Sequence, residues 1–225
     1  GKPVHRVEDV GLLTGHDRFT GDYPNPDGLH VQFVRSAMAH ARITSVDVSG
    51  ALAAPGVFGV YDAEAVGLGQ ILFPAFTSML PDVHRPALAG GIVRFVGEII
   101  VAVAADTLAH AVDAAELVVV DYQPLPAVVD PEAAVASDAV LLFPEVGSNV
   151  VVEIPFEIGE YVPGAVSITT HVLNQRVAVA PMETNAIIAF PGEDGTITSY
   201  VSAQMPHMLR DLTASFIGMD PADLH

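Results

Sequence analysis

Hydrophobic and polar residues alternate along short runs in the first third of the chain. This period of two is typical of half-buried β-strands, whose successive side chains point to opposite faces. The alternating runs lie at 29–34 and 43–48, and a further β-rich run lies at 57–61. Residues 1–17 carry charge and show little periodicity, so we expect them to form an extended N-terminal arm.

The centre of the chain has the pattern strand, helix, strand. Residues 93–105 are rich in β-branched side chains and are interrupted by Gly97, which predicts one strand or a tight pair of strands. Strong helix formers follow over 108–116, and 117–122 returns to a strand pattern. Strand, helix and strand at this spacing form a compact α+β unit. We therefore place the first domain at 18–126.

A second region is predicted beyond a connector that covers 127–150. Its strands are expected at 166–172, 187–190 and 196–202. Pro206 suits the first turn of a helix, which then carries a stripe of apolar residues and ends at Gly218. We assign 151–225 to this second region, in which a further strand is expected to follow the helix.

Composition narrows the classes of partner. The 225 residues carry a net charge of −18, which repels phosphate backbones and anionic lipid surfaces, so nucleic acid is not expected as a partner. The absence of cysteine excludes disulfides, a thiol nucleophile and an iron–sulfur cluster held by thiolates of this chain. No apolar run approaches the ~20 residues of a membrane span. No signal peptide is visible either, so we expect a cytoplasmic location.

Two glutamates in apolar surroundings are candidates for chemistry. Glu98 follows Gly97 in a β-rich run, where a carboxylate can be tuned for acid–base work. We favour a structural role for it, either facing solvent or paired with an arginine such as Arg94. Glu183 lies in the apolar stretch 177–190, and a buried carboxylate needs partners. It either holds a loop by accepting backbone hydrogen bonds or lines a site, and both alternatives stay open.

The loop 202–207 is a third candidate, because it lies between a predicted strand end and a predicted helix start. Mixed folds often build their sites at such positions. Gln204 offers an amide donor and an amide acceptor there. On the residues alone, the favoured interpretation is a loop glutamine that faces water. The nine histidines show no spacing typical of a zinc site.

Taken as a set, these segments resemble the large, molybdenum-cofactor-binding subunit of the xanthine dehydrogenase/aldehyde oxidase family, the molybdenum hydroxylases. The similarity runs in order over nearly the whole chain, and its pieces together are specific to the family but not to one substrate. The segments that carry it are 1–9, 12–15, 18–20, 29–30, 33–36, 40–43, 55–57, 94–98, 114–122, 125–131, 181–183 (Pro-Met-Glu) and 202–207 (Ser-Ala-Gln-Met-Pro-His).

The resemblance implies an α+β fold: an α/β-hammerhead domain over 18–126, followed over 151–225 by the incomplete first molybdenum-cofactor-binding domain. It implies that Gln204 approaches an oxo ligand of molybdenum, which makes this residue the candidate cofactor contact. Glu183, within the Pro-Met-Glu segment, is a weaker candidate for the same site. No protein ligand to the metal is expected on this chain.

The resemblance also implies cofactors and partners. The family holds molybdenum with molybdopterin, and we expect the dinucleotide form here, bound only together with the remainder of the large subunit. Iron–sulfur clusters and FAD are expected on partner chains, alongside a companion chain that completes the molybdenum site. We expect an oligomer that contains this chain, and we expect the chain alone to be inactive.

The sequence departs from the family pattern in three respects. The Gly-rich loop that follows the helix ending near Gly218 is absent, as is the downstream glutamate that acts as a base. Residues 153–176 also lack the usual Ala-rich helical stretch. The alternative hypothesis is a non-enzymatic hammerhead module for assembly or ligand binding. A hydrolase that uses Glu98 or Glu183 is disfavoured, because no pair of nucleophile and base is apparent.

Overall fold

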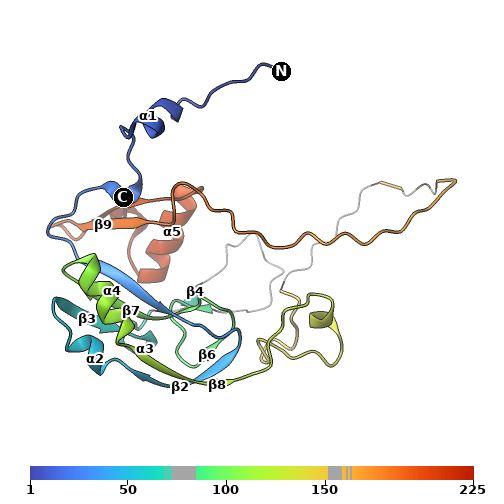
Figure 1. The fold of residues 1–225 in the computed structure, drawn as a ribbon, viewed down its shortest axis with the longest axis horizontal. Coiled ribbons are helices and arrows are strands. Elements are labelled where there is room, and N and C mark those ends of the chain that lie inside the picture. Colours follow the sequence, from blue (N-terminus) through green and yellow to red (C-terminus); the bar gives the residue numbers. More distant parts are fainter. Residues whose placement is uncertain (69, 72–84, 152–158, 161, 163) are drawn as a thin grey trace. The chain divides into compact units, whose positions relative to one another are not determined.

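The structure is a computed structural model that describes residues 1–68, 70–71, 85–151, 159–160, 162 and 164–225 (Figure 1). The chain divides into two compact units. The larger unit comprises Pro24–Glu153 and His207–Leu224. The smaller unit comprises Gly1–Tyr23, Ile154–Pro206 and His225.

A three-stranded antiparallel sheet forms the centre of the larger unit. Its order is β1 (His30–Arg35), β7 (Ile99–Ala105), β3 (Val57–Tyr61). β1 and β3 confirm the strands expected from the first alternating and β-rich runs. β7 is the middle strand and is covered on both faces, which explains why its sequence is almost continuously apolar rather than alternating.

A second three-stranded sheet has the order β6 (Ile92–Val93), β2 (Ala41–Asp47), β8 (Val119–Pro124). β6 and β7 come from the single run expected over 93–105. Gly97 has φ 92°, a left-handed conformation that favours glycine, and it turns the chain between the two sheets. The run is therefore a pair of strands, but the two members belong to different sheets. β4 (Gln70–Ile71) and β5 (Arg85–Pro86) form a separate two-residue pairing.

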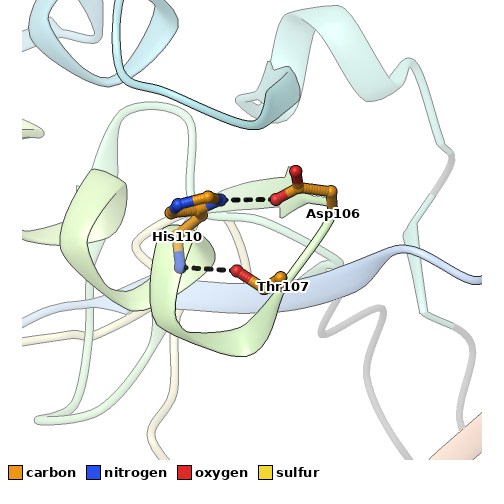
Figure 2. A network of polar contacts seen from close by, with 3 residues as sticks. All are labelled: Asp106, Thr107 and His110. Carbon is orange, nitrogen blue, oxygen red and sulfur yellow. Dashed lines mark hydrogen bonds and ion pairs between the residues drawn. The ribbon is translucent and has the colours of Figure 1, made fainter. Parts of the chain in front are cut away.

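Helix α4 (Leu108–Glu116) packs against the β1-β7-β3 sheet, and it confirms the helix expected at 108–116. Thr107 caps the helix: its side-chain oxygen accepts a hydrogen bond from the backbone N–H of His110 at 3.1 Å (Figure 2). The shorter helices of this unit are α2 (Ser49–Leu52), α3 (Ala63–Val66) and the 3₁₀ turns η3 (Ala133–Val135) and η4 (Pro221–Asp223).

The hydrophobic core lies between these elements. Its buried members are Ala41, Ala51, Ala89, Val93, Ile100, Val101, Val103 and Ala114. Small alanines on α2 and α4 allow the helices to approach closely, while β7 supplies the large side chains. Burial of this apolar surface is the main stabilising contribution to the unit.

The connector is part of the larger unit and is tied to it by Arg94. The Arg94 Nε donates to the Leu142 carbonyl at 2.8 Å, and its guanidinium lies 4.3 Å from the Phe143 ring centroid. Within the connector, the Asn149 side chain accepts from the Leu142 N–H and donates to the carbonyls of Ala134 and Val140. One amide thus closes the connector into an ordered loop.

Helix α5 (Pro206–Ile217) begins and ends where the sequence predicts. Pro206 occupies its first position, and Gly218 follows it with φ 73°. The N–H of Met219 then bonds the Ala214 carbonyl at 2.8 Å, which closes the helix end in a Schellman arrangement.

The smaller unit is built on an antiparallel hairpin of β9 (Ile187–Pro191) and β10 (Ile197–Val201). Both strands confirm the expected ones. His225 lies beside β10 in parallel fashion: its carbonyl accepts from Ser199 N–H at 2.7 Å, and its N–H donates to Ile197 at 2.8 Å. The unit also contains α1 (Asp9–Thr14) and η1 (Thr20–Asp22). The N-terminal arm is therefore not wholly extended.

The prediction of a strand at 166–172 is wrong. The structure assigns no helix or strand between 164 and 186, and the side chains there are largely exposed; Val166 is 79% and Ile168 85% exposed. Their β-branched alternation suits a strand, but a strand also needs a neighbouring strand for its backbone groups, and no strand ladder among the described residues includes this segment.

Candidate functional site

The segments that carry the two candidates Glu183 and Gln204, 181–186 and 202–206, meet at one end of the β9–β10 hairpin. The antiparallel register pairs Ile187 with Val201, so the residues before β9 and after β10 leave the hairpin at the same end. The Ser202 N–H extends the ladder by donating to the Ala186 carbonyl at 3.1 Å. The sequence suggested each segment separately, and the structure brings them together.

Ser202 joins the two segments through its side chain as well. Its hydroxyl donates to the Thr184 carbonyl at 3.1 Å and accepts from the Ala186 N–H at 3.0 Å. With the backbone bond, three hydrogen bonds hold Ser202 against the residues that precede β9. Sequence reasoning noted Ser202 only as part of a motif, because a serine at a strand end carries no signal of the partner it will find.

Gln204 follows two residues later, in the exposed loop between β10 and α5. Within the described part of the chain, no hydrogen bond engages its side-chain amide. A primary amide can donate two hydrogen bonds and accept two. Gln204 therefore presents unused hydrogen-bonding capacity two residues after Ser202, which is anchored to the segment before β9.

Glu183 is half-buried and accepts two hydrogen bonds from one residue. Its Oε1 lies 2.9 Å from the Thr20 backbone nitrogen and 2.9 Å from Thr20 Oγ1, both of which donate. These contacts correspond to the first of the two alternatives, a carboxylate that holds a loop. Sequence reasoning could not find this pair, because nothing in either segment marks a partner 163 residues away.

Backbone strain lies next to the same segment. Ala180 has φ 45° and is the only non-glycine among the described residues with positive φ. It precedes Pro181, a position that favours extended backbone. A side chain in this conformation persists only where its surroundings hold it, and such residues cluster at functional sites.

Glu98 has the structural role that we favoured, by a different contact. It is 4% exposed, and its Oε2 accepts the Arg94 backbone N–H at 2.6 Å. The Arg94 guanidinium is engaged with the connector instead. The carboxylate thus closes the turn between β6 and β7.

Histidines and acidic residues do not gather into a metal site in the parts of the chain that the structure describes: no group of three potential ligands is found there. His40 is buried, and its Nδ1 contacts the Pro126 carbonyl at 2.6 Å. His84 lies outside the described residues. No helix among the described residues is both long and apolar enough to cross a bilayer.

The carboxyl groups whose pKa is lowered, Asp47, Asp106 and Asp194, lie outside the candidate site. The clearest case is Asp106, whose Oδ1 lies 2.6 Å from His110 Nδ1 at the start of α4 (Figure 2). The hydrogen bond from His110 lowers the Asp106 pKa below its ordinary value of 3.8, against a smaller opposing effect of desolvation. The pair is exposed, so it belongs to the surface of the helix terminus.

We expect the His110→Ala variant to raise the Asp106 pKa back toward 3.8, as measured by NMR titration of its carboxyl carbon. A lowered pKa favours the ionised carboxylate in the fold. Its contribution to stability is therefore present above pH 3.8 and lost as the pH falls through the lowered value. An Asp106 titration that is identical in the variant and the wild type would contradict the assignment.

Comparison with known proteins identifies both parts of the chain. The family model described as "aldehyde oxidase and xanthine dehydrogenase, a/b hammerhead domain" matches residues 14–126. The model of the molybdopterin cofactor-binding domain matches residues 144–225. The second match includes the hairpin, Glu183 and Gln204.

Individual relatives are similar to this chain over almost its whole length. The nicotine 6-hydroxylase large subunit of Paenarthrobacter nicotinovorans is 37% identical, over 98% of this chain and 28% of that protein. The structure of CO dehydrogenase from Oligotropha carboxidovorans superposes with a TM-score of 0.80 at 31% identity, covering 98% of this chain and 29% of that one. Quinoline 2-oxidoreductase from Pseudomonas putida 86 gives a TM-score of 0.79 at 32% identity, with coverages of 98% and 29%. The chain therefore spans less than a third of these relatives.

Proposed function

Because the chain belongs to the xanthine dehydrogenase/aldehyde oxidase family of molybdenum hydroxylases, we propose that it forms part of a large subunit that binds a molybdenum–molybdopterin cofactor. Its fold is the hammerhead domain followed by the beginning of the molybdopterin-binding domain. In this proposal the chain supplies scaffold and one residue that contacts the cofactor, Gln204.

The observation that carries this proposal is that the side-chain amide of Gln204 is exposed and free to bind a ligand, as far as the described residues show. Its amide is exposed and has no partner among the described residues. It lies in the segment matched to the molybdopterin-binding domain, on a loop anchored through Ser202. A neutral amide suits an oxygen-rich metal cofactor, because it donates a hydrogen bond without adding a charge or a competing ligand. The residue present therefore fits the group.

Each residue of the candidate site has a distinct task in this proposal. The bound cofactor supplies the oxidation of a C–H bond, with oxygen derived from water. Gln204 binds and orients the cofactor by hydrogen bonding. Ser202 holds the loop that carries Gln204, and the hammerhead domain provides scaffold.

The proposal extends to partners. Relatives are described as a large subunit, a large chain and the gamma subunit of a dehydrogenase complex, which supports a multi-subunit assembly. The 225 residues contain no cysteine, so thiolate-held iron–sulfur clusters must lie elsewhere in such an assembly. We place those clusters and FAD on partner chains, and the remaining part of the molybdenum site on sequence beyond these residues. The dinucleotide form of the cofactor is part of the same proposal.

Elemental analysis of the protein purified from its native host tests the proposed function. We expect molybdenum to copurify with this chain and with at least one further polypeptide. The isolated 225-residue chain, produced in a host that makes the cofactor, should contain little molybdenum, because most of the relatives' length is missing. A metal-free monomer from the native host would contradict the proposal and favour a non-enzymatic hammerhead module.

A further inference from the structure

The N-terminal segment 19–23 is fastened to the β9–β10 hairpin at two separate places. Thr20 is held by Glu183, just before β9. Tyr23 stacks on Tyr200 of β10, with ring centroids 4.7 Å apart and planes 19° from parallel. Phe190 of β9 lies edge-on to Tyr200, with the ring centroids 6.2 Å apart. Stacked and edge-to-face rings stabilise such contacts beyond the area they bury.

The Glu183 contact is the more specific of the two. A single carboxylate oxygen accepts from both the backbone N–H and the hydroxyl of Thr20, and the pair is partly buried. Hydrogen bonds to an ionised acceptor are about twice as strong as neutral ones. Glutamine at this position would keep the acceptor oxygen but not the charge, whereas alanine would leave both Thr20 donors without this partner.

The residues around Glu183 also hold the Gln204 loop. Thr184, the next residue, provides the carbonyl to which the Ser202 hydroxyl donates, and Ala186 exchanges two further bonds with Ser202. The segment before β9 is therefore bonded to the N-terminal segment through Glu183 and to the Gln204 loop through Ser202. The strained Ala180 lies on the same segment, three residues before Glu183, where outside contacts are needed to hold its conformation.

We propose that Glu183 is a positioning residue: by binding Thr20 it fixes the segment 181–186, on which Ser202 and the Gln204 loop are held. The fastening of the N-terminal segment stands on the contacts alone. The consequence for Gln204 rests on the function proposed above. Glu183 is thus assigned no contact with substrate or cofactor.

Amide hydrogen exchange on the 225-residue chain tests the fastening. In Glu183→Ala, exchange of the Thr20 amide should rise about tenfold or more, because its acceptor is gone, and exchange at Ala186 and Ser202 should rise as well. Glu183→Gln should show a smaller rise. Glu193→Ala is the matched control: Glu193 is exposed in the turn of the same hairpin and has no hydrogen bond among the described residues. Exchange at Thr20 that is the same in Glu183→Ala and Glu193→Ala would overturn the fastening.

Turnover of the molybdenum-loaded enzyme that contains this chain tests the positioning role. Glu183→Ala should lower kcat several-fold at equal molybdenum content, with KM within about twofold of wild type, and Glu183→Gln should restore most of the loss. Thr20→Val, which keeps the backbone N–H and removes the hydroxyl, should fall between them. If Glu183→Ala proves unstable, Thr20→Val and Glu183→Gln test the positioning role instead, because both keep a hydrogen bond between these two residues. Wild-type kcat in both variants would then contradict the positioning role.

The outcomes separate this proposal from the proposed function. Faster exchange at Thr20 with unchanged exchange at Ser202 and wild-type kcat overturns the positioning role, while a low kcat in Gln204→Ala leaves the function intact. Wild-type kcat in Gln204→Ala overturns the assignment of Gln204 to the site. The exchange at Thr20 then still decides whether Glu183 fastens the N-terminal segment.

Discussion

Replacement of Gln204 by alanine should lower kcat by roughly ten- to a hundredfold in the enzyme that contains this chain, the usual cost of removing a residue that supports a metal site. The amide is exposed, and none of the described residues uses it, so its loss should leave the fold unchanged. Gln204→Glu should be at least as damaging, because a carboxylate would repel an oxygen-rich cofactor and could compete for the metal. The measurement is kcat at equal molybdenum occupancy.

Gln123→Ala is a matched control for this variant. Gln123 is an exposed glutamine on β8 of the larger unit, far from 181–207 in sequence and not part of the candidate site. It should turn over at the wild-type rate. Equal rates in Gln204→Ala and the wild type would show that Gln204 is only a loop residue that faces water, the interpretation favoured by the residues alone.

Replacement of Ile100 by alanine should lower the free energy of unfolding by about 2–4 kcal/mol. Ile100 is 1% exposed on the central strand β7 and is the largest fully buried side chain in the described core. Truncation removes its buried methyl and methylene groups and leaves a cavity. The side chains packed around β7 cannot easily move to fill this cavity, because both faces of the strand are covered. Chemical denaturation followed by circular dichroism measures the change.

Leu52→Ala removes a similar aliphatic side chain from the surface. Leu52 is 55% exposed on α2, so the variant should change stability by about 0.5 kcal/mol or less. Comparable losses in the two variants would mean that β7 does not form the core of the larger unit.

Sequence patterns predicted the elements that local signals in the chain mark. The alternation that identified β1, the helix formers of α4 and the proline and glycine that bound α5 are such signals, and each was confirmed. The alternation at 166–172 is just as regular, yet Val166 and Ile168 remain exposed. A pattern shows that a segment suits a strand, but a strand forms only where a neighbouring strand accepts its backbone hydrogen bonds.

In the candidate site, too, the sequence predicted the features that have local signals and not those that depend on tertiary contacts. Gln204 was found because the end of a strand and a proline that starts a helix are visible in the sequence. The Thr20–Glu183 contact and the bridge made by Ser202 were not, since each depends on two segments that only the folded chain brings together. Motif spacing indicated the place of the candidate site, and the tertiary hydrogen bonds show how the two segments of that candidate site are joined.

The Thr20–Glu183 contact also sets an order of events during synthesis. Thr20 leaves the ribosome 163 residues before its partner, and at about 5–20 residues per second this interval lasts roughly 10–30 s. Most of the larger unit, Pro24–Glu153, is complete within that time, and small domains fold faster than this. The N-terminal segment 19–23 therefore lacks its contact with Glu183 while the residues that follow it fold. A nascent chain halted before Glu183 should leave this segment open to proteases, and synthesis of a few tens of residues more should protect it.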